Sequence, residues 1–113
     1  MSKDVLVVTT NDIPGYKVDE VYGEVFGIIV RSRNIFGNIG ASLRTVFGGE
    51  VKGYTMLLAD SREHALARLR DAAAEKGANA VLAMRFDSGD IGQVMNEVAA
   101  YGTAVKISPA KKP

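Results

Sequence analysis

The last third of the chain constrains the fold most, because two strand-like stretches follow directly on a helix-like one. Residues 50–76 repeat apolar side chains at helical spacing, and Gly77 then provides a residue suited to the left-handed conformation in which helices commonly end. Residues 78–88 and 93–107 are rich in β-branched and small apolar residues. This pattern predicts a helix that packs across two neighbouring antiparallel strands.

Two further strands are expected in the first half of the chain. Val5 to Thr9 is a short, nearly continuous β-branched run, and Asn11–Gly15 has the composition of a turn. Val18 to Val30 alternates over a length of roughly 40 Å, which is long against the radius of gyration of about 13 Å expected for a domain of this size. We therefore expect this strand to bend at Gly23 or Gly27, or to project and pair with another subunit.

The helical pattern over Glu50–Lys76 fits one long helix or two abutting helices. One helix is favoured, because no Gly or Pro interrupts the pattern after Gly53. The predicted apolar stripe consists of Val51, Tyr54, Leu58, Ala65, Leu69 and Ala72. The resulting fold class is α+β, with one long helix across an antiparallel sheet in the order strand, strand, helix, strand, strand. Residues 1–113 are expected to form a single domain.

The register of the last two strands depends on the loop that joins them. A three-residue loop at Asp90–Gly92, with glycine in the left-handed conformation, predicts that Arg85 faces Glu97. The same register pairs Phe86 with Asn96, Met84 with Val98, Leu82 with Ala100, Val81 with Tyr101, and Asn79 with Thr103. The Phe86, Met84 and Leu82 pairs are expected beneath the helix and the others on the opposite face. A slip of one residue would exchange the two faces.

A candidate ligand site consists of Arg85, Glu97, Tyr101 and Asn79, which this register places close together. The alternative interpretation is a cross-strand ion pair beside a tyrosine contact. An enzyme would place Arg85, Glu97 and Tyr101 in a cleft between subunits. We favour a non-catalytic protein that needs no cofactor, because a single histidine and the absence of convincingly paired carboxylates leave little for acid–base or triad chemistry. A metal site lined by carboxylates is a third interpretation.

Composition excludes several classes of function. The net charge of +1 argues against nonspecific binding to nucleic acid, and the absence of cysteine excludes disulfides, thiolate catalysis and cysteine-based zinc sites. The apolar run Val5–Val8 is too short for a signal peptide or a membrane span, so a cytoplasmic protein is expected. His64 has no second imidazole at helical spacing and is expected on the surface.

The segment Ser32–Gly49 is expected to be a loop with a short helix near Ile39–Phe47, because four glycines interrupt its apolar spacing. Its basic and apolar residues suit either a subunit interface or contact with a membrane surface. The following Gly48–Gly53 has the glycine spacing of a phosphate loop. Tyr54 stands where that motif requires lysine, so a turn that begins the helix explains it better.

Several motifs together resemble the YbjQ-like family of small prokaryotic proteins. They are Arg44–Thr55, Gly77–Val81, Arg85–Asp87 and Glu97–Val105, with Thr9–Thr10 and Pro14–Tyr16 in agreement. The resemblance implies a subunit like that of dodecin, assembled as a ring of five identical subunits, and a role in binding heavy metals. Because the thiol and imidazole ligands that soft metals prefer are missing, we predict no tight zinc, copper or nickel site. The expected partners are further copies of this chain and a small ligand whose identity the sequence does not indicate.

Overall fold

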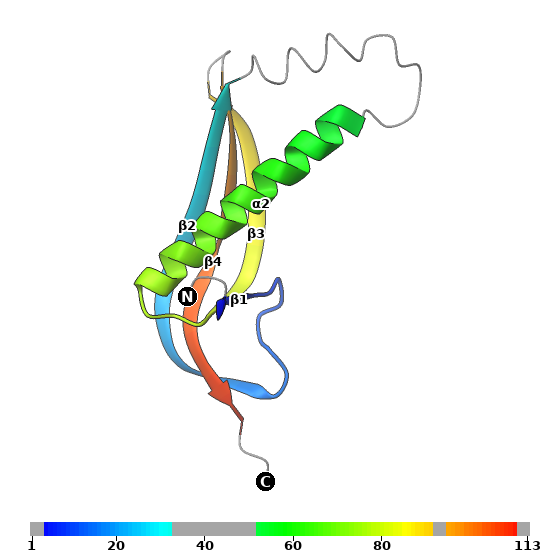
Figure 1. The fold of residues 1–113 in the computed structure, drawn as a ribbon. Helices are drawn as coiled ribbons and strands as arrows, with labels where there is room; N and C mark the ends of the chain where they lie inside the picture. Colours follow the sequence, from blue (N-terminus) through cyan, green and yellow to red (C-terminus); the bar gives the residue numbers. More distant parts are fainter. Residues whose placement is uncertain (1–3, 33–51, 92–94, 111–113) are drawn as a thin grey trace.

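The computed structural model describes residues 4–32, 52–91 and 95–110, in which one long helix lies across a curled four-stranded sheet (Figure 1). In chain order the elements are β1 (Leu6–Val7), β2 (Tyr16–Ser32), α2 (Lys52–Glu75), β3 (Ala80–Ile91) and β4 (Met95–Pro109). The α+β class, the order of the elements and the single long helix predicted from the sequence are confirmed. The expected short helix near Ile39–Phe47 lies outside the described residues.

The sheet is mixed rather than fully antiparallel. Its strand order is β1-β3-β4-β2; β4 pairs antiparallel with both neighbours, whereas β1 pairs parallel with β3. The backbone N–H groups of Leu6 and Val8 donate to the carbonyls of Asn79 and Val81, at 3.1 and 3.0 Å. The prediction of an antiparallel sheet is therefore wrong at this edge. A strand of two residues carries no pattern that distinguishes the two directions of pairing.

β2 does not project beyond its own sheet. It pairs with β4 from Tyr16, opposite Pro109, to Ser32, opposite Met95, so of the two expected alternatives, a bend or a projection, the structure excludes the projection. The predicted bend is confirmed at Gly23. There a register shift interrupts the pairing with β4, and the glycine has a φ of +96°. A glycine adopts this conformation without the steric cost that a Cβ would add.

The buried face of α2 repeats every fourth residue. Ser61, Ala65, Leu69 and Ala73 are each fully buried, and the three apolar ones share a core cluster with residues of β2, β3 and β4. Ala65 and Leu69 confirm the predicted stripe, whereas Leu58 is 46% exposed and Ala72 is half-buried. Small side chains at four-residue steps allow a helix backbone to approach a sheet closely. The buried stripe of the helix therefore passes through Ala73 and not through the predicted Ala72.

α2 ends as the sequence predicts. Gly77 has a φ of +87°, and its N–H donates to the carbonyl of Ala74 at 3.0 Å, while the Ala78 N–H donates to the Ala73 carbonyl at 3.0 Å. These two bonds satisfy carbonyls that the helix itself leaves without a partner. The chain then enters β3 within a few residues, and this fixes where the helix lies along the sheet.

The predicted hairpin loop is placed two residues too early. Asp90 and Ile91 belong to β3, where they pair with Asn96 and Met95, so the connection falls at residues 92–94. Moving the loop by two residues shifts both strands by two. Each residue of β3 from Arg85 onward therefore pairs with a residue of β4 that lies four positions later than predicted. Arg85 pairs with Tyr101 instead of Glu97. Because the shift is even, most side chains keep their predicted face: Met84, Phe86, Val98 and Ala100 all pack in the cluster beneath the helix.

A β-bulge reverses the face of the residues that precede it in β3. Leu82 pairs with Thr103 and Arg85 with Tyr101, so two residues of β3 face one of β4. One of the two is Ala83, with a φ of +54°. As a result Val81 packs beneath the helix, and Leu82 packs in a second cluster with Ala80, Val105 and Ile107, covered by Val8 and Ile13. The sequence-based register has no bulge and assigns these two residues to the wrong faces.

Candidate functional site

The four residues of the predicted ligand site do not meet within one subunit. Arg85 and Tyr101 are register partners, but Glu97 faces Gly89, four positions along β4 and on the order of 13 Å from Tyr101. Asn79 lies beyond the other end of the paired segment, just before β3. The shared cleft between subunits therefore stays a prediction, and two of the residues have identifiable structural partners instead.

Asn79 continues the sheet with its side chain. Its Nδ2 donates to the carbonyl of Ile107 at 2.9 Å, and its Oδ1 accepts from the Ile107 N–H at 2.8 Å. This pair of bonds imitates the pairing of two backbone residues. Asn79 thereby holds the end of β4 where regular pairing between β3 and β4 has stopped at Ala80, opposite Val105.

Arg85 holds the backbone around the bulge. Its Nη1 donates to the carbonyl of Thr9 and to the carbonyl of Met84, each at 2.8 Å. Nearby, the Met84 N–H donates to the Val8 carbonyl at 2.9 Å, so the segment after β1 is bonded along β3. A charge-assisted bond to a carbonyl is stronger than a neutral one. The guanidinium therefore fastens the N-terminal segment to the sheet.

An apolar patch lies on the sheet face that the helix does not cover. It consists of Phe26, Ile28, Val30 and Tyr101, which we call the outer patch, and these residues are between 37% and 52% exposed. Val25 and Ile29, which alternate with them in β2, are buried beneath α2. The rings of Phe26 and Tyr101 lie 6.2 Å apart between centroids. The segment that carries Val8 and Ile13 covers a different part of the outer face.

Two cations, Arg68 of α2 and Lys76 just after it, bond to the free edge of β2. Arg68 Nη1 donates to the Ile28 carbonyl at 2.7 Å, and Lys76 Nζ donates to the Glu24 carbonyl at 3.3 Å. β2 is the last strand of the sheet in the described part of the chain, and these two carbonyls accept from side chains of α2 and the turn after it. Positive charges on an edge strand oppose the addition of another strand. Any strand that pairs at Glu24 or Ile28 must displace them.

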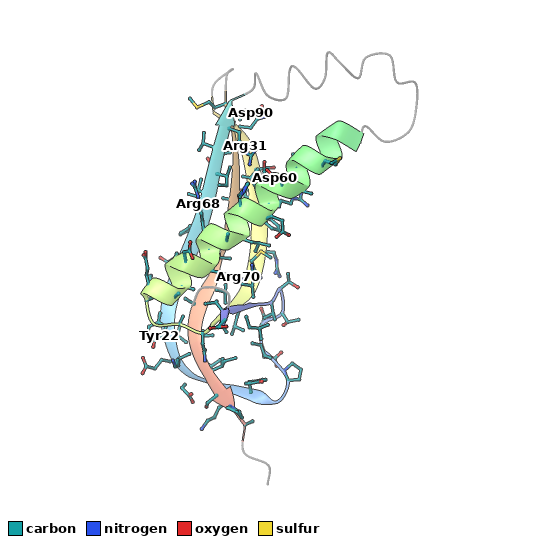
Figure 2. All side chains as sticks on the ribbon, viewed as in Figure 1. Tyr22, Arg31, Asp60, Arg68, Arg70 and Asp90 are labelled. Carbon is teal, nitrogen blue, oxygen red and sulfur yellow. The ribbon has the colours of Figure 1, made fainter. Side chains whose placement is uncertain are left out.

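A charged pocket lies along the seam between β2 and α2. Arg31 Nη2 donates to Asp60 Oδ2 at 2.8 Å and to His64 Nδ1 at 2.9 Å, and His64 Nδ1 lies 3.4 Å from the same Asp60 oxygen. Figure 2 shows Arg31, Asp60 and Arg68 at this seam. The hollow has a volume of about 430 Å³, and we call it the β2–α2 pocket. It is lined by Ile29, Val30, Arg31, His64, Ala67 and Arg68.

The sequence-based interpretation did not predict this pocket. Asp60, His64 and Arg68 are visible at one-turn spacing on the helix, and His64 is exposed as predicted. Arg31 is 29 residues before Asp60, and no local pattern links the two. The signal that could have revealed it is the position of Arg31 in β2, on the same face as the buried Ile29 and therefore facing the helix.

Within residues 4–32, 52–91 and 95–110, no three His, Asp or Glu side chains gather in a way that could hold a metal ion. In the same part of the chain, no helix has the length and apolar character that crossing a bilayer requires.

Comparison with known proteins gives concordant matches. Residues 5–108 match the model of the YbjQ family, described as "Putative heavy-metal-binding". A UPF0145 protein from Acidothermus cellulolyticus is 54% identical over 104 residues, which cover 92% of this chain and 96% of the relative. One from Methanocella arvoryzae is 56% identical over 109 residues, with coverage of 96% and 91%.

Among solved structures, a protein of unknown function from the DUF74 family of Pediococcus pentosaceus has a similar fold. The two chains superpose with a TM-score of 0.56 at 15% identity, over 92% of this chain and 98% of that one. At this identity the likeness shows the fold alone.

Proposed function

This chain belongs to the YbjQ-like family, and we propose that it acts as a self-assembling homo-oligomer, a ring of five subunits, that binds a small ligand or partner where subunits meet. The strand–strand–helix–strand–strand order and the curled sheet support a subunit like that of dodecin. The proposed role is non-catalytic.

The observation that carries this proposal is the exposure of the outer patch. Phe26, Ile28 and Val30 follow one another on a single face of β2, and Tyr101 extends the patch onto β4. An apolar surface of contiguous large residues is characteristic of an interaction site. A second copy of the chain is the occupant proposed, because burying the patch gives a domain of this size additional apolar contact that it cannot make alone.

The two surfaces of β2 differ in how readily they accept another subunit. Arg68 and Lys76 occupy acceptors on the free edge, whereas nothing in the described part of the chain covers the outer patch. The interface is therefore proposed to use the outer face of the sheet. If a strand of another subunit also pairs with the free edge of β2, it is proposed to do so past Ile28, where neither cation is bonded. Arg85 and Tyr101, which are register partners, lie on the hairpin that carries this face.

Light scattering coupled to size exclusion tests the assembly. The wild-type protein is expected to elute as a pentamer, and Ile28→Asp is expected to release folded monomers because it places a charge in the buried interface. Leu58→Asp is the matched control, since Leu58 is similarly exposed but lies on the helix. A wild-type monomer at micromolar concentration contradicts the proposal. Native mass spectrometry of the untagged pentamer then reports any retained ligand.

A further inference from the structure

The β2–α2 pocket carries an excess of positive charge. Two guanidinium groups, those of Arg31 and Arg68, line it, and one carboxylate, that of Asp60, lies beside it. His64, whose Nδ1 accepts from Arg31, also lines the pocket. Ile29 and Ala67 form the apolar part of the lining, and Val30, whose side chain belongs to the outer patch, borders it. A hollow of this size, with an apolar wall and a few convergent polar groups, has the character of a small-molecule site.

Both guanidinium groups are held in place before any ligand arrives. Arg31 is fixed by Asp60 and His64 and is only 21% exposed, while Arg68 is fixed by its bond to the Ile28 carbonyl. A guanidinium has five N–H donors in a rigid fork. The bonds to Asp60, His64 and Ile28 use only part of this capacity. Side chains that are already ordered lose less entropy when they bind a ligand.

We infer that the β2–α2 pocket binds the oxyanion of a small molecule, a phosphate or carboxylate group, between Arg31 and Arg68. The planar fork of arginine matches the spacing of the oxygens in both groups. The hollow of about 430 Å³ is larger than a bare ion needs, and the proposed ligand carries an apolar body beside Ile29 and Ala67. The inference goes beyond the proposed assembly, and a monomer could bind in the same way.

His64 provides a direct reporter, because it is the chain's only histidine and its ring signals in proton NMR need no further assignment. Inorganic phosphate and acetate are titrated separately at fixed pH, with sodium chloride at matched ionic strength as the reference. The His64 signals are expected to shift and saturate with phosphate, acetate or both. Shifts with both anions that merely equal those in chloride and never saturate would overturn the inference.

Three variants locate the binding groups. Arg68→Gln is expected to weaken binding by about tenfold to a hundredfold, the loss of one charged hydrogen-bonding group. Arg62→Gln removes the same charge from the opposite flank of α2, where Arg62 lies 5.2 Å from the centre of the Phe86 ring, and is expected to leave the affinity unchanged. Equal weakening by both variants would mean a general charge effect and would refute the site.

Asp60→Asn provides a test that misfolding cannot imitate. Asparagine keeps an oxygen that accepts from Arg31 but removes the negative charge beside the pocket. The affinity for phosphate is expected to rise by about fivefold, the effect of one exposed charge at short range. An affinity that falls while the thermal unfolding midpoint stays unchanged would overturn the placement of the anion next to Arg31.

Discussion

Gly27 of β2 lies directly against the backbone of Ala65 in α2. A Cβ on the glycine would overlap the Ala65 carbonyl oxygen and the Leu69 backbone nitrogen. The glycine is therefore present for close approach and not for a bend, since the pairing of β2 with β4 is regular there. Its neighbours Val25 and Ile29 pack on either side beneath the same helix.

This contact predicts that Gly27→Ala destabilises the protein by about 1–3 kcal/mol or more, because backbone atoms cannot move aside as a flexible side chain can. Gly89→Ala is the control. Gly89 also lies in a strand, but an added Cβ meets nothing within 4 Å, and the change in unfolding free energy is expected to stay near zero. Urea unfolding measures both. Equal effects would mean that α2 does not rest on Gly27.

Leu69→Ala is expected to cost about 2–5 kcal/mol, since Leu69 is fully buried in the main core cluster and its loss leaves a cavity. His64→Ala, on the exposed flank of the same helix, is expected to cost about 0.5 kcal/mol or less, as for most surface substitutions. Denaturant midpoints for the two variants should rank in this order. The reverse ranking would contradict the orientation of the helix.

Ser61→Ala is expected to stabilise the protein. Ser61 is fully buried, and its hydroxyl has no hydrogen-bond partner within the described part of the chain. Removing an unsatisfied buried polar atom recovers about 1–3 kcal/mol, and alanine is also the better helix former. Ser88→Ala at an exposed position serves as the comparison. A lower melting temperature for Ser61→Ala would show that the hydroxyl has a partner after all.

Asn79→Ala is expected to cost about 1–3 kcal/mol, because two hydrogen bonds to the backbone of Ile107 are lost. Asn79→Asp keeps the acceptor but cannot donate to the Ile107 carbonyl, so it should also destabilise, although it has nearly the same shape. Asn11→Ala in the exposed turn is the control. Hydrogen exchange at the end of β4 should accelerate in both Asn79 variants, and unchanged protection there would argue against the bridging role.

Arg85 and Glu97 are expected to be uncoupled. Arg85 lies opposite Tyr101 and is bonded to the Thr9 carbonyl. A double-mutant cycle of Arg85→Met and Glu97→Gln should therefore give an interaction energy within about 0.5 kcal/mol of zero in the Ile28→Asp background, which is expected to be monomeric. Repeating the cycle in the assembled protein separates two cases. Strong coupling that appears only after assembly would show that Arg85 of one subunit lies close to Glu97 of another, as the predicted cleft requires.

Local patterns were sufficient to identify the long elements and the end of α2. The apolar spacing of residues 50–76 with Gly77 identified α2 and its end, and the alternation in β2 and β4 identified two long strands, because these patterns follow directly from helix and strand geometry. The same reasoning placed Met84 and Phe86 beneath the helix despite a wrong loop, since an even register shift preserves the faces.

Relations between distant segments were decided by the tertiary structure. The bulge at Ala83, the parallel pairing of β1, the contact of Gly27 with Ala65, and the meeting of Arg31 with Asp60 and His64 each depend on two backbones brought to a particular distance. A sequence pattern records which face a side chain takes, not what lies opposite it. Packing of the whole sheet against α2 selects those neighbours, and the candidate anion pocket exists only as a result of that packing.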